Sequence, residues 1–279
     1  MIPVVPLLRG GKVYSSLDVQ DVNPVTGGDA VAQVTMSNSG LIKRDLLDLE
    51  ESRKALAKFT TQELLDITLA AGDIFLNDDL PVGSSGQLQS PEDYLLTLAA
   101  TSGLPHSLIR MNMKRLHGVF SQVPTIFKGL SRGLSPEVLD HGYIDQHEVK
   151  VAFVPTTNAL GVILPSNSPA VNALWIPSIA MKTPVILKPG REEPWTPWRI
   201  IQAFIKAGAP AEAFSFYPAN HDGSSAIIRN CKRVMLFGGA DTVRQYENDS
   251  SVEVHGAGRS KILIGDDEIE NWKDHLDLI

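Results

Sequence analysis

The sequence has very little cysteine, because Cys231 is the only one among its 279 residues. A single cysteine excludes an internal disulfide framework, so we expect a reducing compartment, the cytoplasm. The seven histidines are scattered, with no HExxH motif and no Cys/His cluster. Because zinc sites are built from such clusters, the sequence predicts no metal site.

Basic charge and long apolar runs are lacking as well. Lysine and arginine number 25 against 32 aspartates and glutamates, which gives a net charge of −7. Without a basic surface, nucleic acid is not an expected partner. No apolar run approaches the ~20 residues of a membrane span, and the N-terminal MIPVVPLLRGGK does not have the pattern of a signal peptide. With 43% hydrophobic residues, the chain is predicted to be an ordinary soluble globular protein.

The first 135 residues are predicted to be mainly helical. Two short strands are expected within 22–36, around a Thr-Gly-Gly-Asp turn. Leucine and alanine then recur at three- and four-residue spacing, which is the pattern of amphipathic helices. Thr60 with Glu63, and Ser90 with Pro91, are typical helix starts. The predicted helices cover about 40–59, 61–77, 91–102 and 107–120.

Beyond residue 148 the pattern changes to strands alternating with helices. The predicted strands are 148–154, 160–164, 184–188, 213–217, 233–237, 252–254 and 261–265. Helices are expected up to 180, over 193–207 and 223–229, and from 240 onward. Most of these strands are rich in Val, Ile, Leu and Phe without polar alternation, as in parallel sheets buried on both faces. The sequence therefore predicts an α/β fold, a Rossmann-like parallel sheet with helices on both faces, preceded by a mainly helical N-terminal segment.

Candidate site residues lie in the loops after these strands, where such folds bind their ligands. In Pro165-Ser-Asn-Ser-Pro169, the amide of Asn167 could donate to a developing oxyanion or cap the following helix. Lys188 ends a buried strand, where a lysine can hold ribose hydroxyls or a phosphate, or remain a solvated charge. The spacing alone leaves both pairs of alternatives open.

Glycines mark two further strand ends. The Gly-Gly-Ala of 238–240 opens a helix whose N-terminus could bind a pyrophosphate. Gly256 and Gly258 suggest the dinucleotide motif, but Lys261 stands where its third glycine should be. Just before them, Glu253 is open to three interpretations: a solvated strand residue, a ribose ligand or a catalytic base.

In this order and spacing, the loops resemble the cofactor-binding domain of the aldehyde dehydrogenase superfamily. The matching segments are GVILPSNSP, AMKTPVILKPG, IIQAFIKAGAPAEAFSFYP, VMLFGGADTV and VEVHGAGRSKILI. The resemblance implies that Asn167 stabilises the oxyanion, Lys188 binds the adenosine ribose and Glu253 is the general base. The cofactor-binding residues that it implies are Pro165, Ser166, Lys188, Pro189, Arg191, Gly223, Phe237, Gly238, Gly239 and Ala240.

The same resemblance implies a domain organisation and a function. An NAD(P)-binding domain is expected over 1–254, interrupted at 145–158 by an oligomerisation β-arm, with the start of a truncated catalytic domain at 255–279. The full-length protein would be a homo-oligomeric, nicotinamide-dependent oxidoreductase acting on an aldehyde or an acyl-CoA. The nicotinamide cofactor would then accept or donate the hydride.

Three departures from the family pattern bear on cofactor and substrate. Arg191 stands where many NAD-preferring members carry a glutamate, which favours NADP because arginine attracts a 2′-phosphate. The 238–240 segment lacks the hydroxyls of the usual Thr-Gly-Ser. The loop after Glu253 reads Val-His-Gly-Ala-Gly-Arg, which is more similar to the acyl-CoA reductase branch.

The family's nucleophilic cysteine is missing from the sequence. It normally follows the glutamate by roughly thirty to forty residues, whereas Cys231 precedes Glu253 and the chain ends at Ile279. We therefore expect the cofactor-binding portion of a longer reductase, inactive alone. Two alternatives remain, a non-catalytic nucleotide-binding or interaction module of natural length 279, and a fragment that binds its cofactor poorly.

Overall fold

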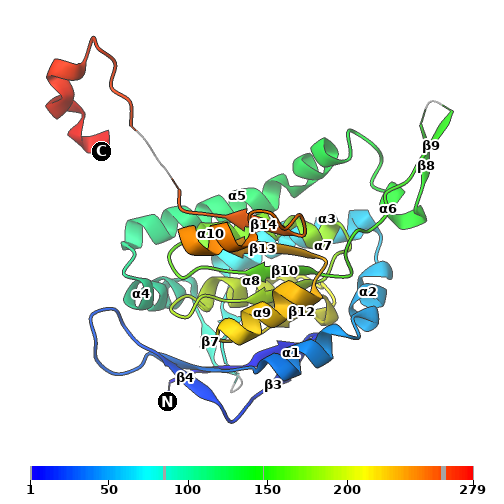
Figure 1. The fold of residues 1–279 in the computed structure, drawn as a ribbon, viewed down its shortest axis with the longest axis horizontal. Coiled ribbons are helices and arrows are strands. Elements are labelled where there is room, and N and C mark those ends of the chain that lie inside the picture. Colours follow the sequence, from blue (N-terminus) through cyan, green and yellow to red (C-terminus); the bar gives the residue numbers. More distant parts are fainter. Residues whose placement is uncertain (1, 84–85, 147, 259–261, 279) are drawn as a thin grey trace.

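A seven-stranded sheet forms the centre of the computed structural model, which describes residues 2–83, 86–146, 148–258 and 262–278 (Figure 1). Its strand order is β14-β13-β10-β11-β12-β2-β3. The strands are β2 (Leu7–Arg9), β3 (Lys12–Tyr14), β10 (Leu160–Ile163), β11 (Val185–Lys188), β12 (Phe214–Phe216), β13 (Arg233–Phe237) and β14 (Val252–His255). The five strands from β10 to β14 are parallel, which confirms the predicted Rossmann-like sheet.

The strand order creates a switch point beside β10. The chain runs outward from β10 through β11 to β12, then returns to add β13 and β14 on the other side. In register, Ile163 of β10 lies opposite Lys188 on one side and Leu236 on the other. Because the carboxyl ends of parallel strands share one edge, the loops that follow all five strands meet there.

Two antiparallel strands at the sheet edge are not predicted by the sequence. The hairpin of β2 and β3 turns at Gly10 and Gly11, whose φ angles of 53° and 76° favour glycine. A Cβ on Gly11 would lie 2.3 Å from the backbone carbon of Ala211, so the hairpin packs directly on the turn before β12. Strands of only three residues, flanked by proline and glycine, give too weak a pattern to be predicted.

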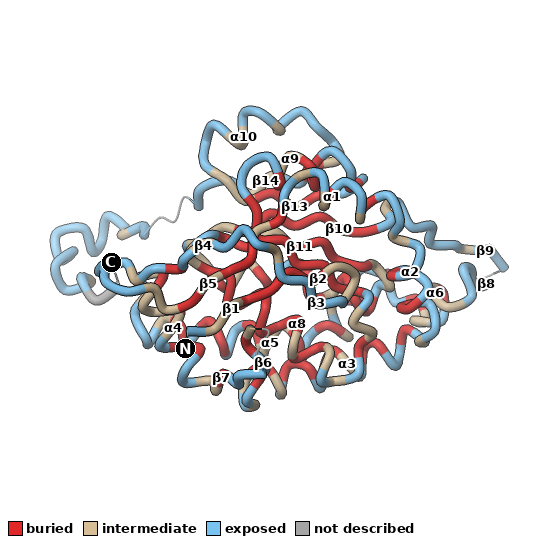
Figure 2. The backbone as a smooth tube through the Cα atoms, turned by 90° about the horizontal axis from the view of Figure 1, so that it is seen from below, coloured by how far each residue is buried: buried red, intermediate tan, exposed pale blue. Residues whose placement is uncertain are grey.

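Helices cover both faces of the sheet, as expected (Figure 2). On one face lie α3, α5 and α8, and on the other α1, α9 and α10. These helices, with their neighbours α2 and α4, are α1 (Ser39–Leu46), α2 (Glu50–Ala57), α3 (Thr61–Asn77), α4 (Pro91–Ser102), α5 (His106–Leu130), α8 (Trp195–Lys206), α9 (His221–Asn230) and α10 (Ala240–Tyr246). The two apolar layers bury the parallel strands on both sides.

The N-terminal half agrees with its predicted elements in most respects. Of the two strands expected within 22–36, β5 (Ala32–Thr35) lies there, whereas β4 (Val19–Val22) ends where that range begins. The two strands form an antiparallel pair, which β1 (Val4–Val5) extends. Thr60 and Glu63 form the expected capping box, and Ser90 caps α4. A small hairpin of β6 (Leu80–Pro81) and β7 (Leu88–Gln89) lies between α3 and α4.

Three predicted helices differ from those observed. The helix predicted over 40–59 is two helices, because the Asp48 carboxylate accepts a hydrogen bond from the Glu50 N–H at 3.3 Å, which competes with helix continuation. The helix predicted to end at Phe120 continues as α5 to Leu130. Before residue 180, the chain forms η1 (Pro169–Leu174) and α7 (Pro177–Ala180), two short pieces.

The remaining segments lie outside the layered core. β8 (Ile144–Gln146) and β9 (Val149–Val151) form an antiparallel hairpin that projects from the body, and α6 (Val138–His141) precedes it (Figure 1). The prediction of an oligomerisation arm at 145–158 falls on this hairpin and stays a prediction. The strand predicted for 261–265 is wrong over 262–265, which form no strand, and Lys261 lies outside the described residues. η3 (Ile269–Leu278) ends the chain.

Candidate cofactor site

A pocket of about 400 Å³ opens at the carboxyl ends of β10, β11 and β12. It is built from the loop after β10, the loop after β11 and the start of α9. Five of the predicted cofactor residues line it: Pro165, Ser166, Lys188, Pro189 and Arg191. The structure thus gathers half of the predicted cofactor set at the place where doubly wound sheets bind ligands.

Lys188 is the last residue of β11 and lines the pocket with a half-buried side chain. Burial lowers the pKa of its ammonium group, the nearby charge of Arg191 lowers it further, and Glu192 acts in the opposite sense. In the described part of the chain, its Nζ makes no hydrogen bond or ion pair. An ammonium group held in a pocket without an internal partner is suited to a ligand that supplies hydroxyl or phosphate oxygens.

Gly190 brings the loops after β10 and β11 into contact. A Cβ at this position would lie 2.6 Å from both the Pro165 carbonyl oxygen and the Ser166 Oγ. Ser166 Oγ also accepts a long hydrogen bond of 3.4 Å from the Glu192 N–H. Gly190 is a pocket residue that the sequence analysis did not single out, although its position in Lys-Pro-Gly after a buried strand was a usable signal.

The pocket carries positive charge. Lys188 and Arg191 line it together with His221, and none of the described residues that line it is acidic. His221 is the first residue of α9, and the N-cap Asn220 accepts hydrogen bonds from the Asp222 and Gly223 N–H groups. The sequence does not indicate His221 as a site residue, because His221 comes near Lys188 only when the loop after β12 folds to the same edge of the sheet.

Gly223, predicted to bind the cofactor, lies in α9 beside the pocket rather than among the residues that line it. A Cβ there would lie 2.3 Å from the Ala219 Cβ and 3.1 Å from Ile42 Cδ1. The glycine therefore allows α9 to approach α1 closely. Its role toward a cofactor stays a prediction.

The other predicted cofactor residues follow β13. Phe237 ends that strand, Gly239 is the N-cap of α10, and Ala240 begins the helix. Gly238 lies against Thr242, since a Cβ there would come within 2.6 Å of that side chain. These four residues, Phe237, Gly238, Gly239 and Ala240, share the carboxyl edge but do not line the pocket around Lys188.

Glu253 lies on β14 with His255 as its neighbour on the same strand face. The Glu253 Oε1 is 3.0 Å from His255 Nε2, although Nε2 makes no aligned hydrogen bond in the described chain. The imidazole stacks on Phe237 of β13, with ring centroids 4.6 Å apart and planes at 15°. The Glu253 side chain itself is 63% exposed, so it is open to an incoming group.

Asn167 is exposed in the loop after β10, and its amide makes no hydrogen bond among the described residues. The alternative of a helix cap is wrong, because the N-cap of η1 is Ser168 and no side chain caps it. β10 and β14 both flank β13, with Ile163 opposite Leu236 and Leu236 opposite Val254. Asn167 therefore follows β10 at its carboxyl end, whereas Glu253 lies within β14, two strands away, in register with Met235 of β13.

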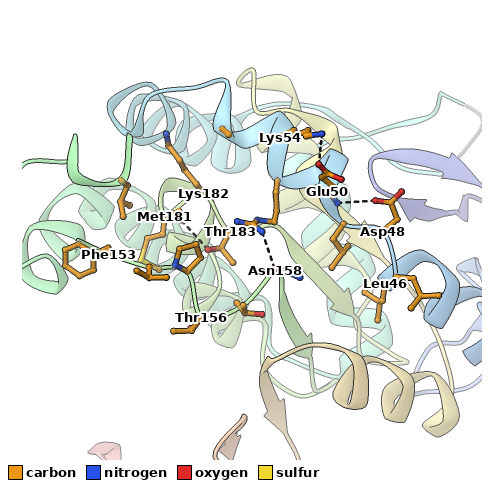
Figure 3. Close-up of a pocket in the computed structure, with 18 residues that line it drawn as sticks. Leu46, Asp48, Glu50, Lys54, Phe153, Thr156, Asn158, Met181, Lys182 and Thr183 are labelled. Carbon is orange, nitrogen blue, oxygen red and sulfur yellow. Dashed lines mark hydrogen bonds and ion pairs between the residues drawn. The ribbon is translucent and has the colours of Figure 1, made fainter. Parts of the chain in front are cut away.

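A larger cavity of about 740 Å³ lies at the opposite edge of the sheet (Figure 3). It is lined by Asn158 and Thr183, which precede β10 and β11, and by residues of α2. Its cations already have partners, since Lys54 pairs with Glu50 at 2.6 Å, and Arg53 donates to Asn158 at 3.2 Å. It contains none of the predicted site residues, and size alone does not make it the site.

Across the described ranges, no three His, Cys, Asp or Glu side chains gather closely enough to hold a metal ion. Within the same ranges, no helix combines the length and apolar character needed to cross a bilayer.

The family model described as "Aldehyde dehydrogenase family" matches residues 89–264, which is more than half of the chain. The chain belongs to the aldehyde dehydrogenase family. The match covers the parallel sheet, the pocket around Lys188 and the strand that carries Glu253. No curated protein sequence matches the chain.

Solved structures of aldehyde dehydrogenases share the fold. A putative aldehyde dehydrogenase from Bacillus subtilis aligns with a TM-score of 0.68 at 13% identity, over 90% of this chain and 54% of its own. An NAD-dependent aldehyde dehydrogenase from Sinorhizobium meliloti aligns with a TM-score of 0.71 at 17% identity, over 92% and 50%. The chain thus spans about half the length of these relatives.

Cys231 does not have the character of an aldehyde dehydrogenase nucleophile. Its side chain is buried between α9 and β10, and a Cβ on Gly161 would lie 3.2 Å from its Sγ. Burial raises the pKa of the Cys231 thiol to about 12. A thiol that stays protonated at neutral pH and is closed to solvent cannot attack an aldehyde.

Proposed function

We propose that this aldehyde dehydrogenase chain is the cofactor-binding portion of a nicotinamide-dependent oxidoreductase that acts on an aldehyde or an acyl-CoA. The main support for the proposal is the pocket around Lys188. It lies at the carboxyl edge of a Rossmann-like sheet, it is lined by cations without ion-pair partners among the described residues, and Gly190 allows its two loops to meet. Its relative from Staphylococcus aureus, a betaine aldehyde dehydrogenase, was solved in complex with NAD⁺ and has the same fold.

The residues present fit the adenosine half of such a cofactor. Lys188 Nζ would donate to ribose hydroxyls, and the rings of Pro165 and Pro189 would form apolar walls. Gly190 allows the two loops that form the pocket to approach each other, because a side chain there would collide with Pro165 and Ser166. Bound there, the nicotinamide cofactor supplies hydride acceptance or donation.

Arg191 is the basis for proposing NADP as the preferred cofactor. Its guanidinium lines the pocket beside Lys188 and has no ion pair among the described residues. A guanidinium can bind a 2′-phosphate with two parallel hydrogen bonds, which the unphosphorylated NAD cannot use. None of the described residues that line the pocket is acidic, although Glu192 nearby partly offsets the positive charge.

Asn167 and Glu253 are proposed as the catalytic residues. The free amide of Asn167 would donate to the oxyanion that forms when a thiolate attacks the carbonyl carbon. Glu253 would accept a proton from water or from the thiol, and its exposed carboxylate leaves it accessible for that transfer. Because Cys231 is buried, we propose that the nucleophilic thiolate is contributed from outside these 279 residues.

The substrate class divides into two cases. An accessible Glu253 suits hydrolytic release of an acid, whereas the His255-Gly-Ala-Gly258 loop favours the acyl-CoA branch. A full-length enzyme of the acyl-CoA class would need CoA for product formation from an aldehyde. Aldehyde oxidation that proceeds at the same rate without CoA would contradict that branch. The homo-oligomer and the cytoplasmic location remain predictions.

A titration of the 279-residue chain with NADPH and NADH tests the cofactor proposal. Fluorescence should report saturable binding of NADPH, with weaker binding of NADH. A folded chain that binds neither nucleotide would contradict the proposal. The alternative, a non-catalytic nucleotide-binding or interaction module, is favoured by the inaccessible Cys231. It predicts NADPH binding with no aldehyde or acyl-CoA turnover by the longest polypeptide that the gene encodes.

A further inference from the structure

A buried acid lies in the loop that forms one wall of the cofactor pocket. Glu193 is in the loop between β11 and α8, three residues after Gly190, and its side chain is 0% exposed. Its Oε1 accepts hydrogen bonds from the Thr196 N–H at 2.8 Å and the Thr196 hydroxyl at 2.6 Å. Its Oε2 has no hydrogen-bond partner in the described chain. A buried carboxyl group with one empty oxygen is costly, so it calls for an explanation.

The occupied oxygen links the loop to a helix distant in sequence. Thr196 Oγ1 is 2.7 Å from the Tyr94 hydroxyl of α4, and since Thr196 donates its proton to Glu193, Tyr94 donates to Thr196. The result is a chain of donors from Tyr94 through Thr196 to Glu193. α8 has its own attachment to α4, because the Trp195 indole donates to Thr101 at 3.0 Å. The Glu193 carboxyl group therefore joins the loop to the first turn of α8 and, through Thr196 and Tyr94, to α4.

The secured loop is the one that forms one wall of the pocket. Pro189, Gly190, Arg191 and Pro194 all line it, so both sides of Glu193 touch the cavity while Glu193 points away. On the outer side, the one hydrogen bond that holds Glu192 within the described residues is its N–H bond of 3.4 Å to Ser166 Oγ. Loops with so few attachments open readily unless a buried anchor holds them.

We propose that Glu193 is a positioning residue, whose buried carboxyl group holds Gly190 and Arg191 in place for the cofactor through Thr196 and Tyr94. The proposal rests on the proposed cofactor function for its role, but the anchoring itself does not depend on any ligand. Glu193 touches no substrate or cofactor, and acts through the shape of the loop.

Hydrogen–deuterium exchange tests the anchor without a cofactor. In Glu193→Ala the amides of 190–193 should exchange at least about ten times faster than in the unaltered chain, because opening becomes easier. Glu193→Gln keeps an acceptor oxygen for Thr196 and should stay within about three-fold of the unaltered rates. Unchanged loop exchange in folded Glu193→Ala overturns the proposal, as does equal acceleration in the glutamine variant.

Affinity for NADPH gives the functional readout. Glu193→Ala should bind NADPH at least about ten times more weakly, and Glu193→Gln should restore binding to within about three-fold. Glu192→Ala removes a carboxylate from the same loop and is the matched control, expected to bind NADPH no more weakly. If the unaltered chain binds no NADPH, the proposed function fails, and loop exchange alone decides the anchor.

A second pair of variants covers the case in which Glu193→Ala does not fold. Thr196→Val removes the hydroxyl that joins Glu193 to Tyr94 at nearly constant shape, and Thr196→Ser keeps it. The valine variant should show faster loop exchange and weaker NADPH binding, and the serine variant should show neither. A purely structural role would lower the melting temperature of the valine variant and leave NADPH affinity and loop exchange unchanged, which would contradict the proposal.

Discussion

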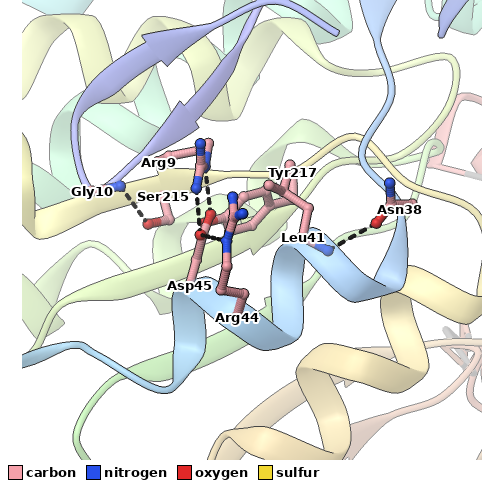
Figure 4. A network of polar contacts seen from close by, with 8 residues as sticks. All are labelled: Arg9, Gly10, Asn38, Leu41, Arg44, Asp45, Ser215 and Tyr217. Carbon is pink, nitrogen blue, oxygen red and sulfur yellow. Dashed lines mark hydrogen bonds and ion pairs between the residues drawn. The ribbon is translucent and has the colours of Figure 1, made fainter.

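Two clusters of cations differ in whether the protein supplies their partners. Around Arg9, Asp45 accepts two hydrogen bonds of 2.6 Å from the guanidinium and one of 3.0 Å from the Tyr217 hydroxyl (Figure 4). Around Lys188, neither the ammonium group nor Arg191 has an ion pair within the described chain. The first cluster links β2 to α1 through the Arg9–Asp45 ion pair. In the second cluster, the cationic groups of Lys188 and Arg191 remain able to bind a ligand.

The pKa directions express the same difference. The hydrogen bond with Asp45 raises the pKa of Arg9. Burial raises the pKa of Asp45, but the hydrogen bonds from Arg9 and Tyr217 outweigh burial and leave it lowered. At Lys188 burial and Arg191 both lower the pKa. Satisfied charges contribute to stability, and charges left unsatisfied beside a cavity are suited to binding, so variants should separate the two effects.

Glu193, the unsatisfied acid, should give the largest effect, and it is a pH effect. Burial raises its pKa to about 8 in the folded chain, while the unfolded chain loses the proton near 4.5. Between these values the folded chain binds more protons, so its stability falls as the pH rises from 4.5 to 8, by on the order of 4 kcal/mol. Urea unfolding of Glu193→Gln should lack this fall. An equal fall in both proteins would place its cause elsewhere.

Lys188→Met should give the second largest effect, a loss of NADPH affinity. It removes the donor from the pocket while keeping the length of the side chain, so NADPH affinity should drop about 100-fold, or about 2.7 kcal/mol. Stability should stay level or rise, because a partly buried unpaired cation is lost. Calorimetric titration measures the first and thermal unfolding the second. If the variant lost stability and kept its NADPH affinity, Lys188 would serve the fold rather than cofactor binding, which contradicts the proposed difference between the two clusters.

Asp45→Asn should show the opposite pattern. The variant leaves the half-buried Arg9 without its carboxylate, so the free energy of unfolding should fall by about 2 kcal/mol, a value discounted for partial exposure. NADPH affinity should be unchanged within error, since none of this cluster lines the cofactor pocket. Chemical denaturation measures the loss.

Arg191→Glu should have the smallest and most selective effect. An acid in place of the guanidinium would repel a 2′-phosphate, so NADPH affinity should fall about ten-fold more than NADH affinity. Titration of the variant with both nucleotides provides the comparison, with Arg191→Gln as a neutral control. Equal losses for the two nucleotides would end the case for NADP.

The parallel strands of the sheet could be predicted from the sequence because each has a clear local pattern. Val185–Lys188 and Arg233–Phe237 are apolar runs with turn signals on both sides, and such runs have few alternatives to a buried parallel strand. The break between α1 and α2 could not be predicted, because it depends on one hydrogen bond from the Glu50 N–H to the Asp48 carboxylate that competes with an otherwise helical pattern.

The site could be predicted only where one loop carries its own signal. Lys188 and Arg191 were found because they follow a recognisable strand. His221 was missed because the fold brings it to Lys188 from a distant segment. Glu193 was missed because two adjacent glutamates have the pattern of solvated charges, and only tertiary packing buries one of them completely.

The β2–β3 hairpin determines where the sheet stops growing. Every residue of β12 is buried, and without β2 beside it the chain would expose an apolar edge of Phe214-Ser-Phe216 with unpaired backbone groups. Such an edge is a template for another chain. The hairpin replaces it with β3, three residues long and fully exposed, in which Lys12 provides a charge. Residues 7–14 thereby protect the molecule from edge-to-edge aggregation.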